Sequence, residues 1–258
     1  MGNSKKGKLL ILVIIMSQNN ITTVIATSPI PSMPEFNHLK STINSLNLVP
    51  KLAQSKILIV FDFPKANQEM LEYNEYKNNI VKFYKKRSNI KFLHLEEWGH
   101  LSGVMEIAVR NIETPYIFVQ QHDLPLIRGF DLDNVLKCLE KDDLVKHVRL
   151  NKRHNIAVGW DRRPLFGPYE NPYVNLTRTA CWSDQSHLTT RSYYEDIILP
   201  EIKDKKIFME EVFHWKMNLP EGKELEDIHK KLGTFIYGSP GDPPVIRHTD
   251  ARNCFSPV

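Results

Sequence analysis

The stretch "YIFVQQHDLPL", residues 116–126, places polar side chains directly after an apolar run. Gln121, His122 and Asp123 come where a buried β-strand would end, and carboxylates and imidazoles are ligands for divalent metals. Mg²⁺ and Mn²⁺ are commonly held by one or two protein carboxylates together with the phosphates of a ligand. These residues therefore predict a site for a metal-bound, phosphate-containing ligand. A strand end with solvated polar residues is the alternative.

The flanking pattern predicts that this strand belongs to a parallel sheet. Apolar runs alternate with segments whose apolar residues recur at helical spacing. We expect strands at 21–27, 56–62, 90–96 and 115–123, and helices at 36–46, 70–87 and 101–112. This order is typical of an α/β fold with three layers, in which helices cover both faces of a central, mostly parallel sheet. Ligands of such sheets bind at the carboxyl ends of the strands, where residues 121–123 fall.

The second half of the chain is less regular. We expect a strand at 144–152, a long loop at 159–179, helices at 192–202 and 207–218, and two short strands separated by a Gly/Pro turn after residue 233. The sequence contains no repeat and no linker that would separate two domains. We therefore predict one domain over residues 20–258.

Composition and missing motifs narrow the function. The chain has 258 residues, a formal net charge of +4 and 41% hydrophobic residues. This weakly basic balance fits an anionic ligand but does not predict nucleic-acid binding. The sequence has no GxGxxG or GxxxxGK[ST] phosphate loop, no GxSxG elbow and no HExxH motif. A phosphate-containing ligand would therefore need another anchor, such as a metal ion.

The N-terminal residues 1–19 combine a basic start with eight apolar residues at 9–16. This run is shorter than the roughly 20 residues that span a membrane, and no clear cleavage site follows it. We predict a dispensable leader, no spanning segment and a cytoplasmic protein, with a membrane-associated or secretory leader as the alternative. Cys138, Cys181 and Cys254 are odd in number and widely separated, so they predict no disulfide framework.

Taken in order, four stretches resemble the nucleotide-binding half of a GT-A-fold glycosyltransferase of the family-2-like group: ITTVIATSPIP, KILIVFD, GHLSGVMEIAVRN and PYIFVQQHD. In that group a Pro-containing loop meets the nucleoside, a second strand ends in an acidic residue near the base, and a later strand ends in a metal-binding D-x-D motif. The resemblance covers residues 20 to about 215. It departs at D-x-D, where this chain has Gln121-His122-Asp123 and retains only the final Asp.

The resemblance implies that residues 20–125 bind a UDP- or GDP-sugar donor and that 126–258 bind the acceptor. It implies Mn²⁺ or Mg²⁺ as the cofactor, with Asp123 and the late His248 as ligands. It implies donor-binding roles for Thr27, Ser28, Asp62, Arg110, Asn111, Gln121, His122 and Arg247. For each of these residues a structural role, as a turn, a cap or a solvated side chain, is the alternative.

An inverting glycosyl transfer needs a general base for the acceptor hydroxyl. In the resembled group this base lies in an x-E-D motif at a helix start, which implies that Glu211, with Glu210 beside it, is the base. The alternative is an ordinary first-turn pair favoured by the helix dipole. The resemblance also implies that Trp182, Asp184 and His187 face the acceptor, although a buried core Trp is equally compatible with the sequence.

The leading hypothesis is thus an enzyme that moves a sugar from a nucleotide-diphosphate sugar to a hydroxyl of a glycan or glycoconjugate. A sugar-phosphate nucleotidyltransferase is one alternative. Such an enzyme is expected to have a Gly- and Arg-rich signature after the first strand, but the stretch "TSPIPSMP" contains neither residue. A nucleotide- or sugar-binding protein of the same fold without catalytic activity is the other, because the D-x-D motif is reduced.

Overall fold

The computed structural model describes residues 20–29, 35–65, 70–156, 166–218 and 220–249. Its strands are β1 (Ile21–Thr27), β2 (Lys56–Phe61), β3 (Ile90–His94), β4 (Tyr116–Gln121), β5 (His147–Arg149), β6 (Gly167–Tyr169), β7 (Leu176–Arg178), β8 (His187–Thr190) and β9 (Thr234–Tyr237). They form one sheet in the order β3-β2-β1-β4-β8-β5-β9-β7-β6. β7 and β8 run antiparallel to their neighbours, and the other strands share one direction. The predicted mostly parallel sheet is confirmed.

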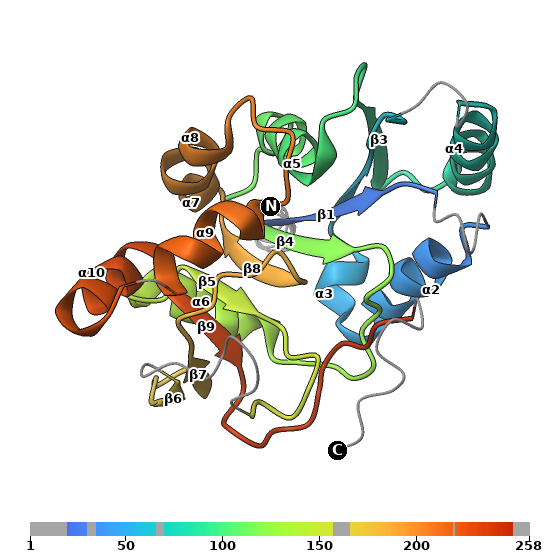
Figure 1. The fold of residues 1–258 in the computed structure, drawn as a ribbon. Coiled ribbons are helices and arrows are strands. Elements are labelled where there is room, and N and C mark those ends of the chain that lie inside the picture. Colours follow the sequence, from blue (N-terminus) through green and yellow to red (C-terminus); the bar gives the residue numbers. More distant parts are fainter. Residues whose placement is uncertain (1–19, 30–34, 66–69, 157–165, 219, 250–258) are drawn as a thin grey trace, which may run out of the picture.

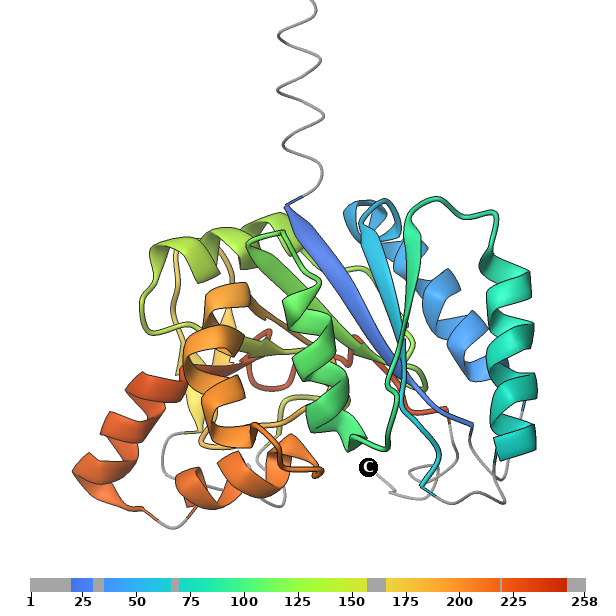
Figure 2. The same ribbon diagram turned by 90° about the horizontal axis from the view of Figure 1, so that it is seen from above.

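Helices cover both faces of this sheet, which gives the three layers seen in Figures 1 and 2. The helical segments are α2 (Asn37–Ser45), η1 (Leu46–Leu48), α3 (Pro50–Ala53), α4 (Met70–Tyr84), α5 (His100–Arg110), α6 (Leu132–Lys141), α7 (Arg191–Tyr193), the π-helical η4 (Tyr194–Ile198), α8 (Leu199–Ile202), α9 (Met209–Asn218) and α10 (Gly222–Leu232). Among the described segments, no helix is both long and apolar enough to cross a membrane.

Two hydrophobic cores lie on opposite faces of the sheet. In β2, Ile57, Ile59 and Phe61 pack into the core that is shared with α2, α4 and α6. Leu58 and Val60 pack into the other core, which α5, α9 and α10 cover. Since successive strand residues point to opposite faces, an all-apolar run such as "ILIVF" is what a strand buried on both sides requires. These strands hold the polar residues at their carboxyl ends in fixed positions.

The second half differs from the sequence prediction in several elements. The predicted loop at 159–179 contains the β6–β7 hairpin, although its residues 159–165 lie outside the described residues. The stretch before the helix at 191 forms β8, which inserts between β4 and β5. The predicted last strand is only a bridge between Leu126 and Ile246. Helices α6 and α10 were not predicted. The leader at 1–19 and Cys254 also lie outside the described residues.

Candidate active site

A pocket of about 540 Å³ lies at the carboxyl ends of β1, β2 and β4. Seven of the predicted site residues line it: Thr27, Ser28, Asp62, Gln121, His122, Asp123 and His248. The sequence pattern did not single out the other lining residues, which are Ala26, Trp98, His100, Leu101, Val104 and Phe208. The pocket thus draws side chains from both halves of the chain. Its place at the strand ends follows from the topology of a parallel sheet.

The C-terminal segment brings His248 to Asp123. The backbone N–H of Arg247 donates to the carbonyl of Pro125 at 3.2 Å, and that of Thr249 donates to the carbonyl of Asp123 at 3.0 Å. This pairing places Nδ1 of His248 3.4 Å from Oδ2 of Asp123. Both side chains are largely buried, with exposed fractions of 15% for His248 and 7% for Asp123. The arrangement presents one imidazole and one carboxylate together to the pocket.

This pair fits a divalent metal that is completed by a ligand. Within the described residues, no group of three or more His, Cys, Asp or Glu side chains is arranged to hold a metal ion. Mn²⁺ accepts both carboxylate and imidazole ligands, and Mg²⁺ usually keeps several waters and ligand phosphates. Asp123 and His248 therefore suit a metal whose other positions are filled by a diphosphate and water.

Thr27 and His122 join β1 to β4 beside this pair. The Thr27 hydroxyl lies 2.7 Å from the Tyr76 hydroxyl and 3.0 Å from Nδ1 of His122. The carbonyl of His122 accepts a hydrogen bond from the Thr42 hydroxyl at 2.7 Å. Burial raises the pKa of Tyr76 to about 12, so this phenol stays neutral. Since the Thr27 side chain is engaged in this network, a ligand would meet the chain here mainly through the backbone and through exposed Ser28.

Asp62 fixes the turn that leads into α5. Its carboxylate accepts hydrogen bonds from the backbone N–H groups of Phe63 at 2.8 Å and Gly99 at 2.9 Å. Burial is the largest influence on the pKa of Asp62 and raises it, while these hydrogen bonds and His100 oppose the shift. The Asp62 carboxyl is thus both a cap for the helix and a polar group of the pocket wall.

His100 stands in a row of aromatic rings at the pocket. It has a φ of 56°, a left-handed conformation that is uncommon outside glycine and that clusters at functional sites. Its ring contacts Phe208 edge-on at 4.1 Å and Trp98 at 5.5 Å between centroids. Nζ of Lys65 lies 4.7 Å from the Trp98 ring centroid. Phe208 is exposed and the other two rings are half-buried, and partly exposed rings can hold a flat ligand such as a nucleobase by stacking.

The two glutamates at the start of α9 face different surroundings. Glu210 is half-buried, and Oε1 accepts hydrogen bonds from the Ser183 hydroxyl and from the backbone N–H of Asp184. Glu211 is exposed; burial lowers the pKa of His100, and the charge of Glu211 is among the influences that oppose this shift. The backbone N–H of Glu211 donates at 3.1 Å to the carbonyl of Phe208, which lines the pocket, so Glu211 lies next to it. Glu210 instead anchors the helix to the segment before β8.

Arg110 and Asn111 lie away from the pocket. Helix α5 begins at the pocket with His100, and its rise of about 1.5 Å per residue puts Arg110 about 15 Å further along. Arg110 pairs with Glu106 and lines a different pocket next to the segment after α8. Asn111 accepts a hydrogen bond from Lys91 at 2.9 Å. Neither residue lines the pocket at the strand ends, because the helix runs back from them, so their predicted contact with a diphosphate there is not proposed further.

Trp182 and His187 belong to the core. Both are 0% exposed, and Nε1 of Trp182 donates to the Tyr193 hydroxyl at 3.0 Å. Nδ1 of His187 lies 2.6 Å from the carbonyl oxygen of Gln185, and its Nε2 lies 2.9 Å from the Tyr194 hydroxyl. Both rings are enclosed in the core of this structure, so the predicted contacts of Trp182 and His187 with an acceptor are not proposed further. Asp184 is 5% exposed, and exposed Arg247 does not line the pocket.

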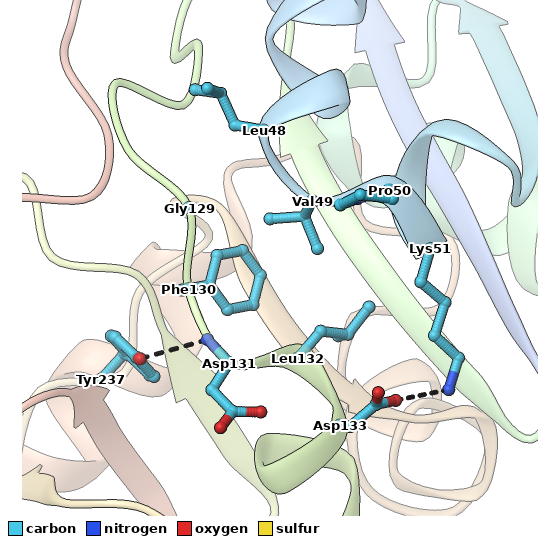
Figure 3. Close-up of a pocket in the computed structure, with 10 residues that line it drawn as sticks. All are labelled: Leu48, Val49, Pro50, Lys51, Gly129, Phe130, Asp131, Leu132, Asp133 and Tyr237. Atoms are coloured by element: carbon cyan, nitrogen blue, oxygen red, sulfur yellow. Dashed lines mark hydrogen bonds and ion pairs between the residues drawn. The ribbon is translucent and has the colours of Figure 1, made fainter.

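A second and larger hollow of about 750 Å³ lies between η1–α3 and the start of α6 (Figure 3). Its polar groups are already paired with one another. Nζ of Lys51 contacts the Asp133 carboxylate at 2.6 Å, and the Tyr237 hydroxyl accepts a hydrogen bond from the backbone N–H of Asp131. The smaller pocket at the strand ends is the better candidate, because it brings together a carboxylate–imidazole pair and three aromatic rings.

No protein-family model and no curated protein matches the sequence. Solved structures do match. S. aureus TarS 1-349, also solved in complex with UDP, has a TM-score of 0.51 and 13% identity, over 89% of this chain and 60% of that one. GalNAc-T7 with UDP, GalNAc and Mn²⁺ has a TM-score of 0.52 and 10% identity, over 89% of this chain and 43% of that one. The chain has the GT-A fold.

The likeness concerns the fold alone, because the identities are low. The GT-A chain described here spans 60% or less of the length of these two neighbours. The expected fold class is therefore confirmed. The activity of the chain does not follow from its fold and has to be argued from the residues of the pocket.

Proposed function

We propose that this GT-A chain is a glycosyltransferase that moves a sugar from a nucleotide-diphosphate sugar to a hydroxyl of a glycan or glycoconjugate, with inversion. The observation that carries the proposal is the Asp123–His248 pair, which the C-terminal segment assembles at the strand ends of this fold. The diphosphate of such a donor is negatively charged and is commonly bound through a divalent cation. Asp123 and His248 would supply the protein ligands of that cation.

The donor nucleotide is proposed to lie between Asp62 and the ring row of Trp98, His100 and Phe208. The Asp62 carboxyl offers a hydrogen-bond acceptor, and the rings offer stacking surface. Because TarS and GalNAc-T7 were both solved with UDP, a uridine nucleotide is the first donor to test, with GDP-sugars as the alternative.

Asp123 and His248 are proposed to hold Mn²⁺ or Mg²⁺ against the diphosphate. Such an ion supplies a Lewis acid that stabilises the negative charge on the departing diphosphate. The exposed backbone at Ser28 lies in the same pocket and is proposed to contact the nucleoside. The D-x-D position that holds Gln121 is not proposed as a metal ligand, because the Gln121 amide donates to the carbonyl of Asp184 at 3.2 Å.

Glu211 is proposed as the general base. Its carboxylate is exposed near the pocket, where an acceptor hydroxyl can approach from solvent. It would take the proton of that hydroxyl as the oxygen attacks the anomeric carbon and the bond to the diphosphate breaks. Attack from the face opposite the diphosphate inverts the anomeric centre.

The direct test incubates the chain with a panel of UDP- and GDP-sugars, with and without Mn²⁺, and monitors the release of free sugar by mass spectrometry. We expect slow hydrolysis of one donor by the wild-type chain, loss of that activity in Asp123→Asn, and no change in Asp133→Asn, whose carboxylate lies in the other pocket. If one donor binds but no variant or condition gives turnover, the chain is a nucleotide-sugar-binding protein instead.

A further inference from the structure

The segment before β8 and the start of α9 meet at two carboxyl groups. Ser183 and Asp184 are 2% and 5% exposed, and they lie against half-buried Glu210. Oε1 of Glu210 accepts a hydrogen bond from the Ser183 hydroxyl and a second, at 3.2 Å, from the backbone N–H of Asp184. Oε1 of the Glu210 carboxylate is thus supplied with two hydrogen-bond donors.

The Asp184 carboxyl has the opposite surroundings. Its Oδ2 is shielded from water and receives no hydrogen bond from any group in the described part of the chain. Because Oε1 of Glu210 lies 3.2 Å from the backbone nitrogen of Asp184, the carboxyl groups of the two residues are close neighbours. Two ionised carboxylates in contact at a buried site repel each other, and each leaves lone pairs without donors. A single proton removes the repulsion and turns one of the oxygens into a donor.

We propose that Asp184 and Glu210 share one proton as a hydrogen-bonded carboxylic acid–carboxylate pair, and that this pair positions the start of α9. Burial, followed by the charge of Glu210, raises the pKa of Asp184 well above its ordinary value. The pair is a feature of the fold by itself. Only its consequence for catalysis, through adjacent Glu211, rests on the proposed glycosyltransferase function.

The pair also reaches the end of β4. The side-chain amide of Gln121 donates to the carbonyl of Asp184 at 3.2 Å and lies 3.4 Å from Oδ1 of the same residue. Gln121 stands two positions before Asp123. Asp184 therefore links the strand end that carries Asp123 to the helix that carries Glu211. Asp184 is in this way a positioning residue for two groups of the candidate active site.

The charges around the pair are consistent with one shared proton. Burial lowers the pKa of His147 and of His187, and burial raises the pKa of Tyr194, so these three neighbours are neutral. The charge of Glu210 acts on half-buried Lys152, whose pKa is lowered by burial and by nearby Arg153 and Arg149. A second negative charge at this buried site would therefore add mainly repulsion.

The primary test is infrared spectroscopy of the full chain without ligand, near neutral pH. The wild-type protein is expected to show a protonated-carboxyl band that disappears in Asp184→Asn and persists in the matched control Glu211→Gln. Asn mimics the protonated acid, because its amide can donate to Glu210. A wild-type spectrum without this band, or a band that persists in Asp184→Asn, would overturn the proposal.

Folding stability gives a second readout that needs no enzyme activity. Asp184 carries its proton in the folded chain and loses it in the unfolded chain above its ordinary pKa of 3.8. The stability that the raised pKa represents is therefore present below pH 3.8 and is lost as the pH rises toward the folded-state pKa. Relative to Asp184→Asn, the wild-type folding equilibrium constant should fall about tenfold per pH unit in this window. Parallel pH profiles of the two proteins would contradict the shared proton.

The catalytic consequence has its own measurement. Asp184→Asn should keep kcat, whereas Asp184→Ala should lower kcat about 100-fold with little change in KM for the donor, because Glu211 is misplaced. The positioning role is wrong if Asp184→Ala keeps the wild-type kcat, or if kcat falls as far in Asp184→Asn as in Asp184→Ala. If the wild type has no transferase activity but the infrared band behaves as expected, the pair stands and the proposed function fails.

Discussion

At the scale of single residues, neighbouring carboxylates have different surroundings and therefore different roles. Asp62 caps a turn while facing the pocket, and Asp123 meets a histidine from the other end of the chain. Glu210 is held by two hydrogen bonds, while Glu211 remains exposed. The base is therefore proposed at Glu211, the residue of the pair that an acceptor can reach.

The first prediction concerns Glu211. Replacing it with Gln removes the proton acceptor but keeps the size of the side chain, so kcat for transfer should fall by about 10²–10⁴-fold. Binding of the donor nucleotide should be unchanged, since Glu211 is not proposed to contact it. Steady-state kinetics and nucleotide titration measure the two effects separately.

Glu224→Gln is the matched control, because Glu224 is also an exposed first-turn glutamate, on α10. It should keep wild-type kcat. Undiminished kcat in Glu211→Gln would remove Glu211 as the base and would leave the ordinary helix-dipole role as the explanation.

The strand-end residues could be predicted from the sequence, because an apolar run followed by polar residues marks the rim of a parallel sheet. The burial of Trp182 and His187 could not, because nothing local distinguishes a Trp that stacks on a sugar from one that donates to Tyr193 in the core. The ring row was missed for a related reason, since Trp98 and His100 lie more than 100 positions from Phe208 in the chain.

At the scale of elements, the parallel half follows its sequence pattern closely and the second half does not. Helix α6 does carry a local sequence signal: Leu132, Val135, Leu136 and Leu139 recur at helical spacing, and Asp131 caps the first turn through Asn134. In contrast, β8 is short, Thr-rich and buried on both faces, so it shows no alternation. Its place between β4 and β5 depends on long-range pairing that a local pattern does not encode.

The second prediction concerns the glycine that ends α10. Gly233 has a φ of 55°, and a Cβ there would lie 2.4 Å from the Leu144 carbonyl oxygen and 2.8 Å from the Lys146 nitrogen. Both are backbone atoms that cannot rotate away. Gly233→Ala should therefore lower the free energy of unfolding by about 3 kcal/mol, as the sum of left-handed strain and overpacking. Urea denaturation measures this change.

Gly222→Ala separates the two contributions. Gly222 has a similar φ of 54°, but a Cβ added there would meet no atom within 4 Å. This variant should lose only the conformational part, about 1 kcal/mol. Equal losses in the two variants would show that the close approach of α10 to the segment before β5 contributes nothing.

At the scale of the whole molecule, both faces of the sheet are packed and several histidines are enclosed with them. Burial lowers the pKa of His187 and of His229 to about 4, and it lowers the pKa of His147 well below its usual value near 6.5. These rings are neutral in the folded chain. In the unfolded chain each would take up a proton near pH 6.5.

The third prediction follows from these directions. Because the folded-state pKa values are depressed, the stability they represent is present above pH 6.5 and is lost as the pH falls from 6.5 toward 4. Each histidine should contribute a loss of about 1.4 kcal/mol per pH unit in this window. Urea midpoints measured across the window test this slope.

His229→Gln should reduce the dependence of stability on pH by the contribution of one histidine, about 1.4 kcal/mol per pH unit. The control His154→Gln, at an exposed position, should leave this dependence unchanged. A folded chain whose urea midpoint stays constant from about pH 6.5 to about 4.5 would contradict the burial of neutral histidines in this fold.

The central claim is that the pocket at the strand ends binds a nucleoside diphosphate through a metal held by Asp123 and His248. Calorimetric titration of the chain with UDP and GDP, each with and without Mn²⁺, tests it most directly. We predict that one of the two, UDP first, binds only with Mn²⁺, and that Asp123→Asn abolishes and His248→Asn weakens this binding. Failure of both diphosphates to bind, or equal binding by the wild type and Asp123→Asn, would contradict the claim.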